Sequence, residues 1–227
     1  ELPEVEVTRL GLKPLLKLKV GKVIIRNHSL RWPINSALPE LLKNQMLLDL
    51  SRRGKYILAK FNSGTLIIHL GMSGRLCIVS ADEVLNKHDH VDIQFKQNNL
   101  ILRYRDPRRF GSILWTEKDP YNHKLIKNLG PEPLNEEFDA KYLFSRLRNK
   151  QQCIKNAIMD SHMVVGVGNI YASEALYAAG IRPHRISKKV SMKEVSGLVK
   201  SIKNVIKEAI IKGGSTMNDF FDVNGEN

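Results

Sequence analysis

The chain has 227 residues, of which 42% are hydrophobic and 26% are charged. This composition excludes a disordered chain and predicts one large core or two modest ones, with two compact domains as the expectation. Lysine and arginine number 36 against 23 acidic residues, so the formal net charge of +13 favours an anionic partner such as a nucleic acid over a merely soluble basic surface. No stretch reaches the roughly 20 apolar residues of a membrane helix and no leader precedes the fold, so we expect a cytoplasmic protein without a membrane partner.

The first half of the chain is expected to form a helix followed by a β-domain. Pro3 and Glu4 mark a helix start, and apolar residues then recur at helical spacing, which predicts a helix over residues 3–17. Short β-rich runs separated by turn residues follow, and they predict an antiparallel sandwich or barrel. The expected strands are residues 23–26, 47–50, 56–61, 65–70, 76–79, 91–95, 100–104 and 113–115.

The second half is expected to be helical, so the fold class is α+β. Residues 129–133, Leu-Gly-Pro-Glu-Pro, break regular structure twice, and we place the boundary between a domain of residues 1–130 and a domain of residues 131–227 there. Ser191 and Glu194 form a capping box ahead of a long apolar stripe, and Gly213-Gly214 is expected to stop that helix.

The run from Val164 to Tyr171 predicts an anion site. Gly166 and Gly168 relax the backbone just before Asn169, which we expect to cap a helix that begins near Ile170. Such a corner presents unpaired N–H groups at the positive end of a helix dipole, and both features suit a phosphate.

Two amino groups are candidates for chemistry. An α-amine titrates at about 7.7 to 8.0, so an amine tethered at the start of the chain could form a Schiff base with an aldehyde or a sugar carbon, although an ordered terminus is more often structural. Lys55 follows Arg52-Arg53-Gly54 in a cationic turn. This turn is either a solvated charge cluster or a rigid strand edge from which Lys55 meets phosphate or substrate.

Two further turns carry exposed side chains of a type that fits a gap in a base stack. Met72 lies between Gly71 and Gly74, and Arg108 and Phe110 lie in the run Asp-Pro-Arg-Arg-Phe-Gly. Proteins that extrude a base fill the gap with apolar side chains and cover the orphaned partner with arginine. Ordinary packing beneath a loop is the alternative for Met72.

A metal site is possible but weakly indicated. His88, His90 and Asp92 alternate and would share one face of a strand, yet phosphate binding by His88, or a buried hydrogen-bonded histidine, is the favoured interpretation. Cys77 and Cys153 are too few and too far apart for a zinc module or a disulfide scaffold, and each is expected to be a small buried apolar residue.

Seven motifs in order resemble the bacterial formamidopyrimidine-DNA glycosylase family over residues 1–220. They are Leu2-Pro3-Glu4-Val5-Glu6, Gly54-Lys55-Tyr56, His69-Leu70-Gly71-Met72-Ser73-Gly74, Lys87-His88-Asp89-His90, Asp106-Pro107-Arg108-Arg109-Phe110-Gly111, Leu129-Gly130-Pro131-Glu132-Pro133 and residues 164–174. The resemblance implies an N-terminal β-sandwich joined to a helix-two-turn-helix domain, with double-stranded DNA lying across the cleft between them.

The resemblance also implies roles for particular residues. In the family, the N-terminal proline of the mature protein attacks C1′ of the sugar and forms a Schiff base. The glutamate that follows this proline is the proton donor, and Glu1 matches that glutamate. We therefore expect a proline immediately ahead of Glu1. Lys55 matches a lysine that assists strand elimination. The residues matched to phosphate contacts around the extruded nucleotide are His69, Arg108 and Asn169, and His88 and Lys150 match further DNA contacts. Met72, Arg108 and Phe110 match the three-residue wedge that fills the gap left by the base. The loop that covers the lesion includes Ser215, Thr216, Met217 and Phe220.

The implied activity is excision of oxidised purines, such as 8-oxoguanine and formamidopyrimidines, followed by β- and δ-elimination at the abasic site. The implied protein is a monomer at the bacterial nucleoid, acting on DNA that contains an oxidised purine or an abasic site. No cofactor is expected within residues 1–227, whereas the full-length family member carries one zinc ion in a four-cysteine finger beyond this segment. The alternatives are the sister glycosylase for oxidised pyrimidines and a noncatalytic nucleic-acid-binding helix-two-turn-helix protein.

Overall fold

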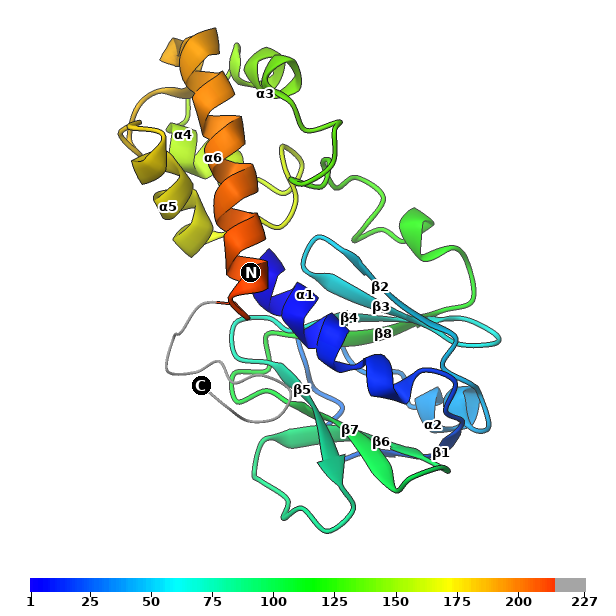
Figure 1. Ribbon diagram of the computed structural model, residues 1–227. Coiled ribbons are helices and arrows are strands. Elements are labelled where there is room, and N and C mark those ends of the chain that lie inside the picture. Colours follow the sequence, from blue (N-terminus) through cyan, green and yellow to red (C-terminus); the bar gives the residue numbers. More distant parts are fainter. Residues whose placement is uncertain (215–227) are drawn as a thin grey trace. The chain divides into compact units, whose positions relative to one another are not determined.

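Eight short strands lie between Val5 and His123, in one of the two units into which the structure divides (Figure 1). The structure is a computed structural model, and it describes residues 1–214. The strands are β1 (Val20–Ile25), β2 (Asp49–Arg53), β3 (Tyr56–Lys60), β4 (Thr65–His69), β5 (Arg75–Ser80), β6 (Asp89–Phe95), β7 (Leu100–Arg105) and β8 (Ser112–Thr116).

The strands form two four-stranded antiparallel sheets, in the orders β1-β6-β7-β5 and β2-β3-β4-β8. Ile57 pairs with Ile68 and Ala59 with Leu66, so these four side chains point into one core shared by both sheets. A slip of one residue would turn them to the outer face, and the core therefore fixes the register. The predicted antiparallel sandwich is confirmed.

The first helix is shorter than the sequence pattern indicates. α1 (Leu2–Gly11) ends at Gly11 and is followed by a 3-10 turn, Lys13–Leu15. Pro14 has no N–H to donate to an α-helical ladder, so the predicted helix over residues 3–17 is wrong in its second half. α2 (Leu38–Leu42) begins one residue before Pro39, and a further 3-10 turn covers Pro120–Asn122.

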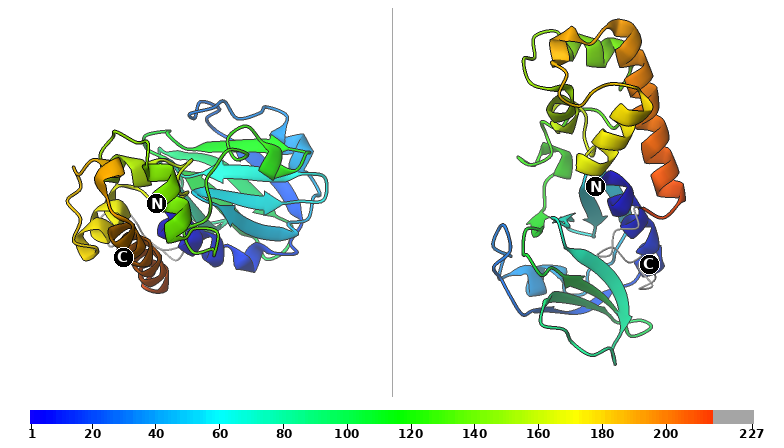
Figure 2. Two further views of the ribbon diagram at one scale, coloured as in Figure 1. Left: turned by 90° about the horizontal axis from the view of Figure 1, so that it is seen from above. Right: turned by 90° about the vertical axis from the view of Figure 1, so that its left-hand side faces the viewer.

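The other unit comprises Glu1–Glu4 together with residues from Lys124 onward. Its elements are α3 (Ala140–Leu147), α4 (Ile154–Met159), α5 (Asn169–Ala178), a 3-10 turn at Ser187–Lys189, and α6 (Met192–Ile211). α6 packs against α3 and α5 (Figure 2). Leu2 is fully buried in the apolar core of these helices, so the first residues of the chain are part of the helical unit.

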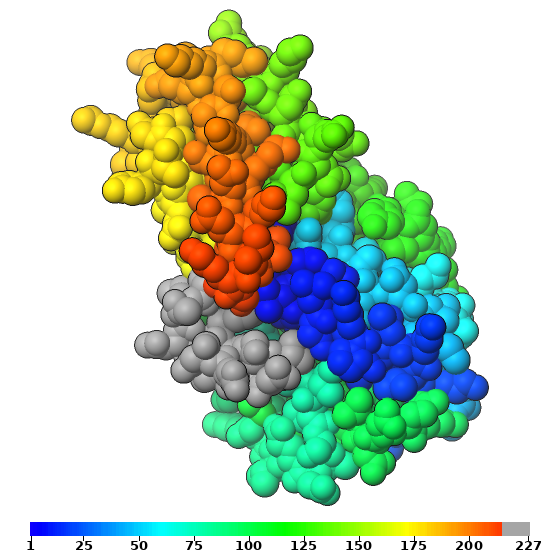
Figure 3. Space-filling model, in the orientation of Figure 1, coloured from blue at the N-terminus to red at the C-terminus, as the bar shows by residue number. Residues whose placement is uncertain are grey.

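The sequence predicts both ends of α6 correctly. Ser191 accepts a hydrogen bond from the Glu194 N–H, and the Glu194 carboxylate accepts one from the Ser191 N–H, which completes the capping box. After Ile211 the chain enters Gly213 and Gly214 with positive φ values of 84° and 100°. Residues of α6 lie on the surface along the length of the helix (Figure 3). Within residues 1–214, no helix combines the length and the apolar character needed to cross a membrane.

Replacing Ser191 by alanine removes one half of the capping box. We expect Ser191→Ala to lower the free energy of unfolding by about 1 kcal/mol, because the first turn of α6 loses a side-chain acceptor. Urea denaturation followed by circular dichroism measures this change. Ser196→Ala is the matched control, since Ser196 is exposed inside the same helix and should not lose stability; equal losses in both variants would contradict the role of the cap.

Candidate functional site

The carboxylate of Glu1 caps helix α5. Its Oε1 accepts the N–H of Ile170 at 2.8 Å, and its Oε2 accepts the N–H groups of Gly168 at 3.0 Å and Tyr171 at 3.3 Å. These donors have no partner within the helix, and an anion at this end also interacts favourably with the helix dipole. A Cβ at Gly168 would lie 2.3 Å from the Glu1 carboxyl carbon, so only glycine lets the carboxylate approach this closely.

Two predictions about this corner are therefore wrong. The N–H groups expected to bind a phosphate are taken by Glu1, which the sequence places 167 residues away from Gly168. Asn169 does not cap the helix, because Gly168 is the N-cap residue and no side chain of the local sequence makes the capping bond. Asn169 is instead the first helical residue, and its side chain is exposed.

Glu4 is the site residue that the sequence interpretation missed. It is 5% exposed; its Oε1 accepts a 2.6 Å hydrogen bond from the Tyr171 hydroxyl, and its Oε2 lies 2.8 Å from the main-chain nitrogen of Glu1. Burial acts to raise the pKa of Glu4, but the amino group of Glu1 and the hydrogen bonds from that group and from Tyr171 lower it to about 2. The available signal was the spacing of three residues between Glu1 and Glu4 at the start of a helix.

Three anchors thus fix the main chain at Glu1. The side chain is bound to α5, the nitrogen faces Glu4, and Leu2 donates its N–H to the Gly166 carbonyl at 3.2 Å. With another residue attached ahead of Glu1, the nitrogen becomes a peptide N–H that can donate to the same carboxylate. A group attached there starts from a fixed point beside two carboxylates, an arrangement suited to holding an amine and moving protons.

In the β-unit, His69 is a neutral hydrogen-bond donor. Its Nδ1 accepts the Gly71 N–H at 3.0 Å, so the proton is on Nε2, and its ring lies 4.8 Å from the Tyr56 ring. Burial, followed by the positive charges of Lys55 and Arg31, lowers the pKa of His69 from 6.5 to about 4. Lys55 lies in the turn between β2 and β3, next to Gly54, whose φ of 58° suits glycine.

The structure brings the two predicted wedge turns together. A Cβ on Gly71 would lie 2.6 Å from the Gly111 nitrogen and from the Phe110 carbonyl carbon, so the backbones of the two turns are in contact. Met72 is 69% exposed and Phe110 51% exposed, and Arg108 is also exposed. Spacing in the sequence could not show this juxtaposition; the wedge role itself stays a prediction.

The structure does not support the metal site of His88, His90 and Asp92, which the sequence indicated only weakly. A bulge between Asp89 and Val91 interrupts the alternation, and Asp92 is bound by Arg103 at 2.9 Å and by Arg26 at 2.6 Å. Burial works against the charge of Asp92, but these hydrogen bonds lower its pKa. His90 is 4% exposed with Nε2 at 2.8 Å from the Asp106 carbonyl, as expected for a buried hydrogen-bonded histidine. Residues 1–214 contain no group of three His, Cys, Asp or Glu side chains that could hold a metal ion.

Among the remaining predicted residues, His88 is linked to the two wedge turns through its carbonyl, which accepts the Asp106 N–H at 3.1 Å. Lys150 follows α3 and is half-buried, and its carbonyl accepts the Lys188 N–H. His88 is half-buried, with its ring 6.4 Å from that of His90. Cys77 and Cys153 are half-buried free thiols, less buried than expected. The loop residues Ser215, Thr216, Met217 and Phe220 lie outside the described residues.

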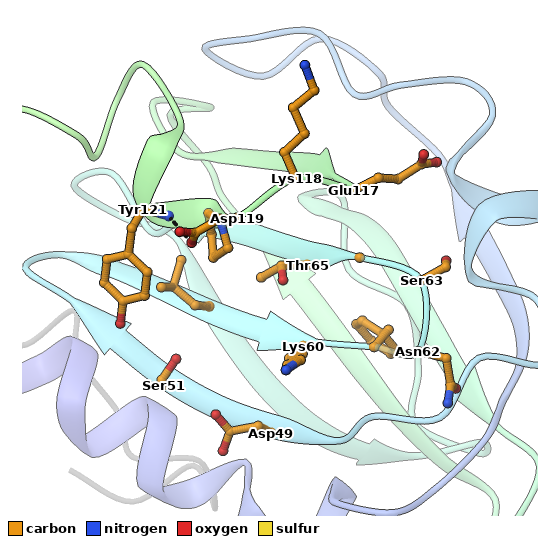
Figure 4. Close-up of a pocket in the computed structure, with 14 residues that line it drawn as sticks. Asp49, Ser51, Lys60, Asn62, Ser63, Thr65, Glu117, Lys118, Asp119 and Tyr121 are labelled. Atoms are coloured by element: carbon orange, nitrogen blue, oxygen red, sulfur yellow. Dashed lines mark hydrogen bonds between the residues drawn. The ribbon is translucent and has the colours of Figure 1, made fainter.

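A cavity of about 580 Å³ lies on the face of the sheet β2-β3-β4-β8 (Figure 4). Acidic and basic side chains both line it, among them Asp49, Lys60, Glu117 and Lys118. None of the predicted site residues lines this cavity, so the chemistry indicated by the sequence lies elsewhere.

Comparisons with known proteins agree with these features. Residues 1–113 match the family model of the formamidopyrimidine-DNA glycosylase N-terminal domain, and residues 129–220 match that of the formamidopyrimidine-DNA glycosylase H2TH domain. A formamidopyrimidine-DNA glycosylase of Methylobacillus flagellatus is 50% identical over 225 residues, covering 99% of this chain and 80% of that protein.

Solved structures are also similar. Lactococcus lactis formamidopyrimidine-DNA glycosylase bound noncovalently to DNA with an AP site has a TM-score of 0.89 and 31% identity, over 96% of this chain and 83% of that chain. The same enzyme with DNA containing Fapy-dG also has a TM-score of 0.89 and 31% identity, over 100% of this chain and 84% of that chain.

The neutral state of His69 has a measurable pH signature. Because its folded pKa is lowered, the stability contributed by neutral His69 is present above pH 6.5 and is lost as the pH falls from 6.5 towards about 4. We expect the imidazole ¹⁵N signals to show protonated Nε2 and bare Nδ1 at pH 7 and 6, with His69→Gln used to assign them. A His69 titration midpoint above pH 6 would contradict the structure.

Proposed function

The chain belongs to the formamidopyrimidine-DNA glycosylase family of base excision repair enzymes, and from this premise we propose that it excises oxidised purines from double-stranded DNA and then cleaves the abasic strand. The observation that carries the proposal is the anchoring of Glu1 by α5, Glu4 and Leu2. Its substrate places the enzyme at the bacterial nucleoid. We expect it to act as a monomer.

The proposed chemistry starts at a proline attached ahead of Glu1. Its imino nitrogen attacks C1′ of the damaged nucleotide, the C1′–N9 bond breaks, and the base leaves with the bonding electrons and gains a proton. The nitrogen loses its own proton to the Glu1 carboxylate, and Glu1 then delivers that proton to the ring oxygen O4′ as the sugar opens and the iminium Schiff base forms. Glu4 lies beside the Glu1 nitrogen and is held there by the Tyr171 hydroxyl, so its carboxylate can stabilise positive charge that develops on the attached proline.

Strand cleavage follows by elimination. A 2′ proton is removed from the Schiff base and the 3′ phosphate leaves, after which the 5′ phosphate leaves by δ-elimination. Lys55 is proposed to assist by holding the departing phosphate with its positive charge.

DNA binding in this proposal depends on phosphate contacts. Neutral His69 donates its Nε2–H to a phosphate oxygen, and the exposed Asn169 donates to a neighbouring phosphate, whereas Arg108 acts in the wedge. His88 and Lys150 supply further contacts. The net charge of +13 supports such binding and predicts that affinity falls with salt.

The described residues do not fit a zinc site, since they hold no group of three potential ligands. The finger implied by the family resemblance would lie beyond Asn227 and would contribute DNA contacts.

Borohydride reduction tests the Schiff base. We expect the full-length protein to form a covalent adduct with 8-oxoguanine DNA in sodium borohydride, and peptide mapping to place the adduct on the residue ahead of Glu1. Lys55→Ala is the matched control: it should slow strand cleavage yet still be trapped, because the nucleophile is the terminal nitrogen. Absence of an adduct in the intact protein, or loss of the adduct in Lys55→Ala, would contradict the proposal that the terminal nitrogen is the nucleophile.

Phe110→Ala tests the wedge. Extruding a base costs a few kcal/mol of stacking, and Phe110 is proposed to offset part of that cost. We expect the single-turnover excision rate to fall about tenfold, or by about 1.4 kcal/mol, with affinity for undamaged DNA nearly unchanged. Tyr121→Ala is the control, because Tyr121 is 50% exposed in the same unit and lies outside the two turns. Equal losses of excision and nonspecific binding would remove the assignment.

A panel of lesions distinguishes the proposed activity on oxidised purines from that of the sister glycosylase, which acts on oxidised pyrimidines. The same duplex is prepared with 8-oxoguanine, a formamidopyrimidine or an oxidised pyrimidine, and excision rates are compared. We expect the purine-derived lesions to be excised fastest.

A further inference from the structure

One buried carboxylate joins the two turns that carry Met72 and Phe110. Asp106 is fully buried, its Oδ1 accepts the Ser73 hydroxyl at 2.7 Å, and its Oδ2 accepts the Gly111 N–H at 2.9 Å. Ser73 is the residue after Met72, and Gly111 is the residue after Phe110. A single side chain therefore fixes the backbone next to both exposed side chains.

Ser73 extends this link to the third exposed side chain. Its hydroxyl donates to Asp106 and accepts the main-chain N–H of Arg108 at 3.2 Å. The hydroxyl thus has a donor and an acceptor partner on the opposite turn. Tyr104 also donates to Asp106 Oδ2 at 3.2 Å, and burial together with the charge of Asp106 raises the pKa of Tyr104, so that it remains a donor.

Packing does not hold the exposed side chains in place. Met72 and Phe110 are both more than half exposed, so their positions depend on the backbone that carries them. In that backbone Arg109, which is not a glycine, has a φ of 58°, in the left-handed region that residues with a side chain rarely adopt. Such conformations persist only where surrounding bonds over-determine them.

A buried charge lowers the stability of a protein unless hydrogen bonds or an opposite charge compensate for the lost hydration. A carboxylate placed among three donors costs free energy to desolvate, and replacing it and its partners by apolar groups is often neutral for stability. Closing two turns does not require a charge. Rigid placement of side chains that must enter DNA together does require strong, directional bonds.

We propose that Asp106, acting through Ser73 and Gly111, is the positioning residue that presents Met72, Arg108 and Phe110 as one preformed wedge. This inference rests on the proposed function, because it assumes that the three side chains enter the base stack together. Asp106 does not touch DNA in this role. It sets the rate at which the wedge inserts.

Ser73→Ala is the most direct test, since it breaks the link without placing a new group in the buried site. The full-length protein is mixed with a duplex that carries 8-oxoguanine and, beside the opposite base, the fluorescent analogue 2-aminopurine. Wedge insertion unstacks the analogue and raises its fluorescence. We expect Ser73→Ala to slow this rise and base excision about tenfold each, while affinity for undamaged DNA changes little. The melting temperature should fall modestly, because Asp106 Oδ1 loses its partner.

Matched variants distinguish positioning from a general structural effect. Ser73→Thr retains the hydroxyl and should restore the wild-type rate, and Ser80→Ala removes an exposed hydroxyl from the strand that follows the same turn and should have no effect. Asp106→Asn should slow insertion at least as much as Ser73→Ala, because an amide cannot accept both the Ser73 hydroxyl and the Gly111 N–H.

A double-mutant cycle gives the decisive outcome. If Ser73 acts through the wedge, Ser73→Ala should add almost nothing in a Phe110→Ala background, since the side chain that it positions is already missing. Multiplicative losses in the double variant, or a Ser73→Ala rate equal to that of Ser80→Ala, would overturn the inference. A wild-type protein that inserts its wedge but excises no base would instead refute the proposed function and leave the positioning role standing.

Discussion

The bond between the Glu1 carboxylate and the first turn of α5 is the interaction on which the site depends. It satisfies N–H groups of Gly168, Ile170 and Tyr171 that the helix cannot satisfy itself, and it places a negative charge at the positive end of the helix dipole. The cost of closing a loop rises only with the logarithm of its length, so three such bonds and the burial of Leu2 can hold the start of the chain. Without them nothing would fix the Glu1 nitrogen beside Glu4.

Buried carboxylates perform the same task in both units. Glu4 is tied to Tyr171 and the Glu1 nitrogen, and Asp106 is tied to Ser73, Gly111 and Tyr104. Each carboxylate binds groups that belong to different segments of the chain. Because an unpaired buried charge is very costly, any movement that separates these segments is opposed. The carboxylates therefore define positions more than they add stability.

What the sequence predicted well is local. The alternating strands and the capping box of α6 each depend on residues a few positions apart, and both are confirmed. The error at α5 has its cause in a long-range partner, because Glu1 replaces Asn169 as the cap of this helix. A long-range partner also accounts for Asp92: Arg103 binds this carboxylate, which the sequence had only weakly indicated as a metal ligand. Likewise, residue types indicated a wedge, but only the tertiary fold brings Gly71 against Gly111.

Preorganisation links these observations to the energetics of base extrusion. A wedge that had to order itself on binding would lose conformational entropy at the moment when stacking energy is also lost. Met72 and Phe110 are exposed apolar side chains, a modest cost that the free protein bears in advance. His69 is preorganised in the same way. Its neutral ring accepts the Gly71 N–H at Nδ1, so the ring has a single N–H to donate, and that N–H points in a fixed direction. Geometry fixed before the substrate arrives leaves more of the binding free energy for distorting the DNA.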